Sequence, residues 1–253
     1  MPHNTETPLN FSGPRIEALL VQDVKDYHVS GPAVVVNTGT TDVFVARTPR
    51  KRIPPLSSTI LTGVRIEEAP SLLLLRVKDG TAIADITHEP GWDLLGNLLA
   101  AAGTPAGDTA PGGDGVLPFP RDTPLWKSPQ DHAGHLDLDP AHLLGESTAP
   151  GRLQPFEIRA NLWFAPAGTD CSIHNQHDFI EVHTQLHGLG RMQKFTEQDH
   201  STLYEDLPMS PGYTTPEPFC STGPAGTYLY PWHQYRADTD CVWLAVEYHA
   251  LPR

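Results

Sequence analysis

The stretch that decides the fold is Gly168–Gly190, which reads GTDCSIHNQHDFIEVHTQLHGLG. Side chains at alternate positions of a strand point to the same face of the sheet. In a strand predicted over residues 179–186, Glu181, His183 and Gln185 therefore share one face. A carboxylate is costly to bury against an apolar core without polar partners, so this polar face is expected to line the lumen of a barrel.

Histidines gather in the same part of the chain. Seven of the 13 histidines lie from position 174 onward: His174, His177, His183, His187, His200, His233 and His249. Two or three imidazoles with one carboxylate form a mixed nitrogen and oxygen ligand set, which suits Fe(II), Mn(II), Ni(II) or Zn(II) and leaves positions open for substrate or O₂. The alternative is a barrel whose histidines only hydrogen-bond one another.

The segment resembles the first motif of the cupin superfamily, whose members are small double-stranded β-helix, or jelly-roll, barrels. That motif runs Gly, five residues, His-x-His, three or four residues, Glu, six residues, Gly. The matching positions are Gly168, His174, Glu181 and Gly188. One departure concerns the second histidine, because Gln176 holds its usual position and His177 follows. The resemblance covers the chain from about residue 155 to 250.

The resemblance implies one divalent metal ion per chain, with Fe(II) favoured and Zn, Mn or Ni also fitting. The implied ligands are His174, His177, Glu181 and His233. His233 is carried over from the second cupin motif, which is degenerate here and follows a turn at Gly226 with a shortened gap after Pro231. Two arrangements stay open: a local bulge brings both His174 and His177 to the metal, or only His177 binds it and His183 completes the shell.

Three functions are compatible with such a barrel, because the fold alone does not fix the activity. We favour a metal-dependent enzyme of the Fe(II) oxygenase type, an oxidoreductase or dioxygenase acting on a small polar metabolite. The first alternative is an isomerase, epimerase or lyase, in which Zn or Mn polarises a carbonyl and Tyr235 or His183 moves the proton. The second is a non-catalytic cupin that binds a small ligand.

Further candidates surround these residues. Tyr235 shares the face of His233 and is a candidate catalytic residue together with His183, whereas Trp232 faces the other way on a regular strand. Gln185, Arg191 and Trp232 are candidate substrate-binding residues. The acidic stretch from Arg191 to Cys220 is either a lid that favours a cationic or amine-bearing substrate or a solvated loop.

Composition excludes several classes of partner. The formal charge is −13 and no basic stripe is present, so neither nucleic acid nor an anionic membrane surface is an expected partner. The N-terminus lacks the apolar core of a signal peptide, and three cysteines without a CxxC motif favour a reducing cytoplasm. By resemblance, a homodimer is expected. No nucleotide-binding motif is present.

The expected fold class is mainly β: a metal-binding cupin barrel over residues 152–253, preceded by an α+β or degenerate cupin segment over residues 1–102. Residues 103–151 are expected to form a linker or loop, because Gly103–Gly115 is rich in Gly, Pro and Asp. The predicted barrel strands are 156–164, 179–186, 228–235 and 241–248.

Four further elements are predicted before the linker. They are a helix over 15–27, a hairpin of 33–36 with 43–46, a hairpin of 72–77 with 81–86, and a helix over 92–102. The apolar run Leu72–Leu75 suits a strand that is buried on both faces.

Overall fold

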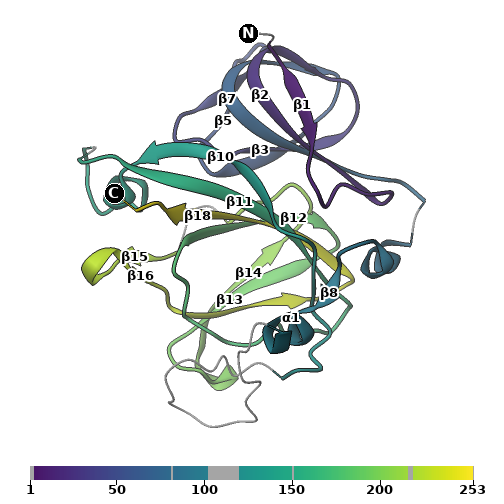
Figure 1. The fold of residues 1–253 in the computed structure, drawn as a ribbon, viewed down its shortest axis with the longest axis vertical. Helices are drawn as coiled ribbons and strands as arrows, with labels where there is room; N and C mark the ends of the chain where they lie inside the picture. The colour runs from purple at the N-terminus through teal and green to yellow at the C-terminus, as the bar shows by residue number, and fades with distance from the viewer. Residues whose placement is uncertain (1–2, 81, 102–119, 150, 216–218, 253) are drawn as a thin grey trace.

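The structure is a computed structural model that describes residues 3–80, 82–101, 120–149, 151–215 and 219–252, and it is mainly β (Figure 1). The Gly/Pro/Asp-rich stretch Gly103–Gly115 lies outside these residues. No helix in the described ranges is long and apolar enough to span a membrane.

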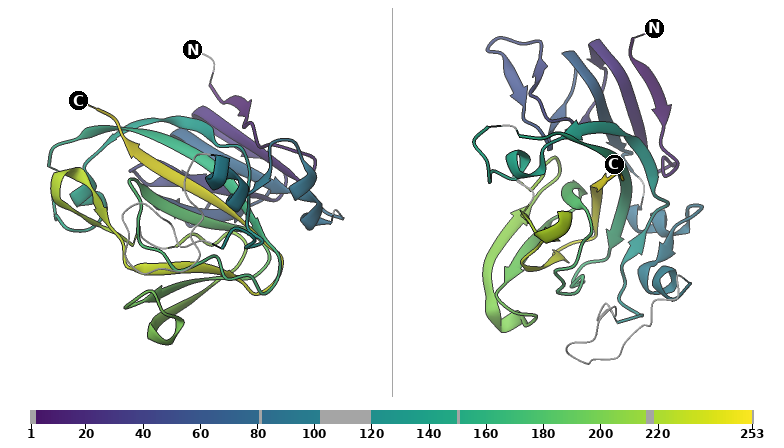
Figure 2. Two further views of the ribbon diagram at one scale, coloured as in Figure 1. Left: turned by 60° about the horizontal axis from the view of Figure 1, so that its bottom comes forward. Right: turned by 60° about the vertical axis from the view of Figure 1, so that its left-hand side comes forward.

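The N-terminal sheet is antiparallel, with the order β1-β2-β7-β3-β6, and β4 pairs with both β5 and β7. Its strands are β1 (Thr5–Pro8), β2 (Ile16–Val29), β3 (Ala33–Asn37), β4 (Val43–Val45), β5 (Lys51–Ile53), β6 (Ser57–Leu61) and β7 (Val64–Val77). It forms one end of the molecule, coloured purple to blue (Figures 1 and 2).

The barrel consists of two antiparallel sheets and a short ribbon. The larger sheet has the order β12-β18-β11-β9-β8, and β10 pairs with β11; the smaller has the order β14-β13-β17. The larger contains β8 (Asp93–Leu94), β9 (Trp126–Lys127), β10 (Asp131–Leu138), β11 (Gln154–Ala165), β12 (Ile180–His187) and β18 (Cys241–Ala250). The smaller contains β13 (Gly190–Phe195), β14 (Leu203–Met209) and β17 (Trp232–Ala237), and the ribbon pairs β15 (Ser221–Thr222) with β16 (Tyr228–Leu229).

Short helices connect these strands. They are η1 (Ile83–His88), α1 (Leu95–Ala101), α2 (Pro140–Leu143), η2 (His200–Thr202) and η3 (Pro224–Gly226). The helix predicted over 92–102 is thus confirmed but shorter, because Asp93 and Leu94 pair with β9. Part of the expected linker is ordered structure, since β9, β10 and α2 all lie between residues 126 and 143.

The predicted barrel strands are confirmed as β11, β12, β16 with β17, and β18. Glycine turns bound the motif that predicted them. Gly188 has φ +75°, and a Cβ there would collide with the carbonyl oxygen of Asp240. Because only glycine adopts this conformation without strain, the chain can turn directly from β12 into β13.

The helix predicted over 15–27 is wrong, because this stretch forms strand β2. Val21, Val24 and Tyr27 are all buried and lie three residues apart. The backbone at Asp23 and Asp26, between them, has positive φ values of 50° and 49°. These two irregular positions change the alternation of the strand into a spacing that resembles that of a helix.

Both predicted N-terminal hairpins are also wrong. Strand β3 pairs with β6 and β7, while β4 pairs with β5 and β7. The Asn37 side chain donates to the carbonyls of Thr41, Ile53 and Pro54, which holds the chain between β3 and β4 in a loop. After β7 the chain forms η1, which Arg15 anchors through Asp85 and Glu89.

Strand β7 confirms the prediction for Leu72–Leu75, since all four side chains are buried. Leu72 and Leu74 belong to the core of the N-terminal sheet, whereas Leu73 and Leu75 belong to a second core with residues of β11, β12 and β18. The N-terminal sheet therefore covers the outer face of the larger barrel sheet.

One buried hydrogen bond crosses this second core. Tyr248 on β18 donates its hydroxyl to the carbonyl of Thr38 at 3.0 Å. We predict that Tyr248→Phe lowers the free energy of unfolding by about 1–3 kcal/mol, because the buried carbonyl loses its partner. Urea denaturation measures this change, and Tyr204→Phe at an exposed position of β14 is the matched control. Equal unfolding midpoints for both variants would contradict the prediction.

Candidate metal centre and cavity

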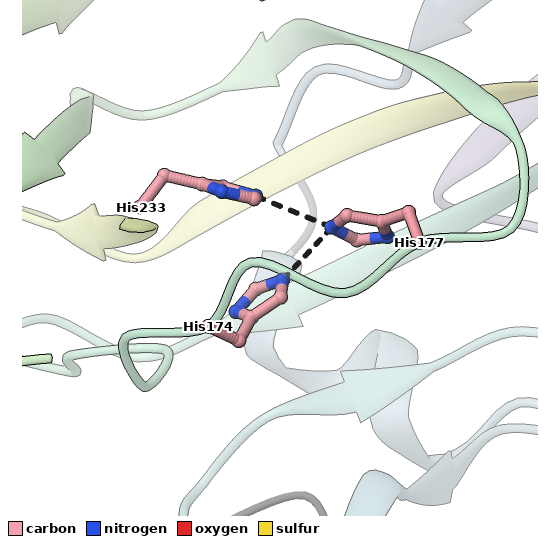
Figure 3. A group of neighbouring side chains, drawn as sticks. All are labelled: His174, His177 and His233. Carbon is pink, nitrogen blue, oxygen red and sulfur yellow. Dashed lines mark hydrogen bonds between the residues drawn. The ribbon is translucent and has the colours of Figure 1, made fainter. Parts of the chain in front are cut away.

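Three imidazoles point toward one another (Figure 3). His174 and His177 come from the segment before β12, and His233 comes from β17. The Nε2 atom of His177 lies 3.1 Å from Nε2 of His174 and 3.3 Å from Nε2 of His233. The structure thus brings together three of the four residues that the sequence analysis predicts as metal ligands.

Backbone pairing holds two of these rings in place. The N–H of His174 donates to the carbonyl of His233 at 2.9 Å, and the N–H of His233 donates to the carbonyl of His174 at 2.9 Å. This isolated antiparallel bridge places the two side chains next to each other. The neighbouring bridge between Asp170 and Arg236 is shifted by one residue in register, and Ser172, with its positive φ, lies between the two bridges.

The backbone also fixes the tautomer of both rings. Nδ1 of His174 lies 3.0 Å from the carbonyl oxygen of Ser172, and Nδ1 of His233 lies 2.9 Å from that of Pro231. A carbonyl oxygen only accepts hydrogen bonds, so each Nδ1 carries the proton and each Nε2 presents a lone pair to the cluster. Neutral imidazole with a free Nε2 is the form that binds metals.

The spacing of the cluster fits a metal ion. Two nitrogen ligands about 2.1 Å from a metal lie about 3.0 Å apart at a right angle and about 3.4 Å apart at the tetrahedral angle. The separations of Nε2 of His177 from Nε2 of His174 and of His233, 3.1 and 3.3 Å, lie within this range. Lone pairs that converge at such distances repel one another unless a cation lies between them, so the donor set suits a divalent metal.

His177 reaches the cluster because its segment is a loop rather than a strand. The backbone at Ser172 has φ +64°, which turns the chain ahead of His174. Tyr230 then fixes the far side: its hydroxyl donates to the carbonyl of Phe179 and accepts from the N–H of Glu181, both at 2.9 Å. This arrangement corresponds to the alternative in which both His174 and His177 reach the metal.

Glu181 lies outside the three-imidazole group. Its carboxylate is 4.0 Å from Nδ1 of His177 and 3.6 Å from Nε2 of His183. It is buried with His183, and the ring of His183 packs edge-on against Tyr235 with 4.1 Å between ring centroids. The alternation of β12 and β17 thus places Glu181, His183 and Tyr235 together, beside the cluster of three imidazoles.

Burial dominates the electrostatics of these groups. It raises the pKa of Glu181 well above its ordinary value, with a further increase from the charge of Glu247. Burial also raises the pKa of Tyr235. The same cause lowers the pKa of His183 to about 3, and burial with the neighbouring imidazoles lowers that of His177 to about 3. The imidazoles are therefore neutral at physiological pH.

Glu247 on β18 is a site residue that the sequence analysis missed. Its carboxylate accepts from Asn161 at 2.8 Å, from Gln130 at 2.7 Å and from His249 at 2.8 Å. Burial by itself would raise the pKa of Glu247, but these hydrogen bonds and the charge of Lys127 together lower it. A carboxylate within the apolar run CVWLAVEY was the signal that could have identified it.

A cavity of about 500 Å³ opens beside the cluster, between the two barrel sheets. His174, His177, Glu181, His183 and Tyr235 line it. Its apolar wall consists of Leu95, Leu99, Leu125, Trp163, Phe179 and Trp243. A limited number of polar groups thus line a mainly apolar space, which is typical of sites for small molecules.

The predicted substrate-binding residues lie elsewhere. Gln185 donates to the carbonyl of His187 at 2.6 Å, and Arg191 pairs with Asp206 and Asp238. Neither these residues nor Trp232 lines the cavity. The stretch from Arg191 to Cys220 contains the hairpin of β13 and β14, and none of its described residues lines the cavity, so the alternative of an acidic lid is not supported.

The buried histidines predict how stability depends on pH in the metal-free protein. Imidazoles in the unfolded chain titrate near about 6.5, whereas His177 and His183 in the folded protein titrate at about 3. Between these values the unfolded chain binds more protons. Stability is therefore full above pH ~6.5 and falls as the pH decreases, by up to about 1.4 kcal/mol per pH unit for each histidine.

Urea denaturation between pH 7.5 and 5 in the presence of a chelator measures this slope. His183→Gln is expected to reduce it, and His28→Gln, at an exposed position of β2, is the matched control. A slope that is the same in all three proteins would show that His183 does not carry the effect.

A second prediction concerns metal content. We expect His174→Ala, His177→Ala and His233→Ala each to reduce the bound metal to less than about a tenth of the wild-type amount, because the loss of one imidazole leaves only two. Glu181→Gln is expected to keep more than half. Inductively coupled plasma mass spectrometry after anaerobic purification measures the content. Loss of metal in Glu181→Gln would instead identify Glu181 as a fourth ligand.

Comparisons with known proteins give only weak likenesses. No protein-family model and no curated protein matches the sequence. A mutant of Bacillus subtilis oxalate decarboxylase is 13% identical over 100% of this chain and 75% of its own, with a TM-score of 0.28. A structure from work on the Mn(II) centres of the same enzyme is 12% identical over 94% and 70%, with a TM-score of 0.28.

An RmlC-like cupin protein from Desulfovibrio desulfuricans is 18% identical over 36% of this chain and 70% of its own, with a TM-score of 0.25. These scores are too low to carry an argument about function. The features of this chain itself are two facing antiparallel sheets, the glycine-bounded motif Gly168–Gly188, and three neighbouring imidazoles that could hold a metal ion. Together they give a mainly β barrel with a candidate metal centre, and the fold class agrees with the cupin-like architecture expected from the sequence.

Proposed function

We propose that this protein is a metal-dependent enzyme that binds a small molecule in the barrel cavity and transfers a proton to or from it. The observation that carries the proposal is the position of Glu181, His183 and Tyr235. All three are buried, line the cavity and lie beside the three-imidazole cluster.

His174, His177 and His233 would hold the metal. A divalent ion at this site would polarise a carbonyl or carboxylate of the bound molecule. The three imidazoles are neutral, so they leave the full positive charge of the ion available for this purpose. The apolar wall of the cavity excludes water and thereby strengthens such electrostatic effects.

The neighbouring residues are suited to move the proton. Glu181 lies 3.6 Å from Nε2 of His183, and burial holds the pKa of this carboxyl group above its ordinary value. A carboxyl group with a raised pKa holds its proton more firmly than an ordinary one and can deliver it to a bound molecule, and general acid–base groups typically contribute a factor of about 10²–10⁴ in rate. Tyr235, whose ring packs edge-on against His183 and lines the cavity, would orient the substrate.

The separation of Glu181 from the cluster favours an isomerase or lyase over the oxygenase. Fe(II) oxygenases typically use two histidines and one carboxylate as ligands, whereas here the carboxylate of Glu181 lies among the proton-transfer groups. An Fe(II) oxygenase is the second candidate. It is supported by the set of three imidazoles, because three ligands leave other coordination positions of the ion free for O₂ and substrate.

Turnover under argon tests the proposal. Protein loaded separately with Zn(II), Mn(II) and Fe(II) is incubated with a panel of small oxo- and hydroxy-carboxylates, and proton NMR monitors the products. We expect product without O₂, at least a 100-fold lower kcat for Glu181→Gln with its metal retained, and no activity for His233→Ala. Lys51→Met, on a strand of the N-terminal sheet, is the control for an unrelated substitution.

Each other result selects a different function. Product that forms only with stoichiometric consumption of O₂ would replace the proposal with the Fe(II) oxygenase. Binding of a panel member without any turnover, in air or under argon, would replace it with a non-catalytic binding protein. Full activity of Glu181→Gln would remove Glu181 from the mechanism.

A further inference from the structure

Lys127 is a cationic residue in the wall of the cavity that the proposed chemistry does not use. It ends the two-residue strand β9, where it pairs with Trp163 of β11 and Asp93 of β8. This pairing on both sides fixes its backbone in the sheet. The side chain is half-buried, and its Nζ lies 5.0 Å from the centroid of the Trp163 ring.

The ammonium group of Lys127 makes no ion pair with a carboxylate of the described residues. By contrast, Lys194 on β13 pairs with Glu205 at 2.6 Å. A lysine that is partly withdrawn from water usually has a carboxylate partner. The position of Lys127 therefore leaves its charge available to a ligand in the cavity.

The nearby carboxylate of Glu247 is already engaged. Its oxygens accept hydrogen bonds from Asn161, Gln130 and His249 at 2.7–2.8 Å. Lys127 affects the pKa of Glu247 only through its charge and makes no hydrogen bond to it. The indole N–H of Trp163, beneath Lys127, is buried and has no hydrogen-bond partner among the described residues. One wall of the cavity thus offers a cation.

The remainder of that wall is apolar. Leu95 and Leu99, one turn apart on α1, line the cavity together with Leu125 and Trp163. Such a surface binds a hydrocarbon or aromatic group and provides no partner for a second charge. The wall therefore fits a molecule with one anionic end and an apolar body.

We propose that the substrate is a small carboxylate with an apolar body, and that Lys127 selects it by pairing with the carboxylate while Leu95, Leu99 and Leu125 hold the body. This inference rests on the proposed function, because it assigns the substrate class of the same cavity. Lys127 acts here as a specificity-determining residue. The opposite preference, for an amine, would use Asp178, which also lines the cavity.

Calorimetric titration with three isosteric probes tests the assignment. The probes are 3-phenylpropanoate, 3-phenylpropanamide and 3-phenylpropylamine, and the protein is loaded with Zn(II) so that no redox reaction intervenes. We expect wild-type protein to bind the acid at least tenfold more tightly than the amide or the amine. Lys127→Met is expected to reduce this acid-to-amide ratio at least tenfold, with unchanged zinc content and unchanged affinity for the amide.

Two control variants separate the charge of Lys127 from other effects. Lys127→Arg is expected to keep the ratio within about threefold of wild type, and Lys51→Met is expected to leave it unchanged. Three results would overturn the inference: a preference for the amine or the amide, an acid-to-amide ratio that Lys127→Met does not change, or no binding of any probe. The second of these would assign the preference to the metal alone.

The outcome is independent of the turnover experiment. Selective binding of the acid through Lys127 without any catalysis would refute the proposed enzymatic function and retain the ligand class. Catalysis under argon with an acid-to-amide ratio that does not depend on Lys127 would support the enzymatic function and refute the role of Lys127 in selecting the ligand.

Discussion

The arrangement of the site depends on the paired backbone hydrogen bonds between His174 and His233. They join the segment before β12 to strand β17, which belongs to the smaller sheet. The same two residues use their Nδ1 atoms on local carbonyls, so the ring orientation and the tautomer are both determined before any ligand binds. Only His177 needs a different support. Tyr230 provides it, because its hydroxyl hydrogen-bonds the carbonyl of Phe179 and the N–H of Glu181 where the chain enters β12.

This pre-organisation explains how the chain accommodates its unusual motif. A strand would point residues at positions i and i+3 to opposite faces, so a His-x-x-His pair could not converge within regular β structure. Here the positive φ of Ser172 and the loop that follows replace the strand. The result is a compact group of neutral imidazoles next to a separate, buried group of Glu181, His183 and Tyr235.

Alternation in the sequence is enough to predict much of this site. The two-residue period of a strand by itself places Glu181 and His183 on one face, and likewise places His233 and Tyr235 on one face. It fails for Lys127, because a two-residue strand has no period. The same period would have placed Glu247 with His249 on one face of β18, but the apolar residues before Glu247 concealed this polar pair. It also fails over β2, where left-handed backbone at Asp23 and Asp26 gives a strand the apolar spacing of a helix.

Strand β18 of the barrel both lines the cavity and fills the core shared with the N-terminal sheet. This double role limits which substitutions can change the ligand that the cavity binds. On β18, Trp243 and Glu247 line the cavity, while Leu244, Val246 and Tyr248 between and beyond them fill the core shared with the N-terminal sheet. A substitution that reshapes the cavity from this side would also disturb that core. Helix α1 carries no such double constraint, because Leu95 and Leu99 line the cavity without joining the core shared with the N-terminal sheet. New ligand preferences would therefore arise most readily through Leu95 and Leu99, while the sheet stays unchanged.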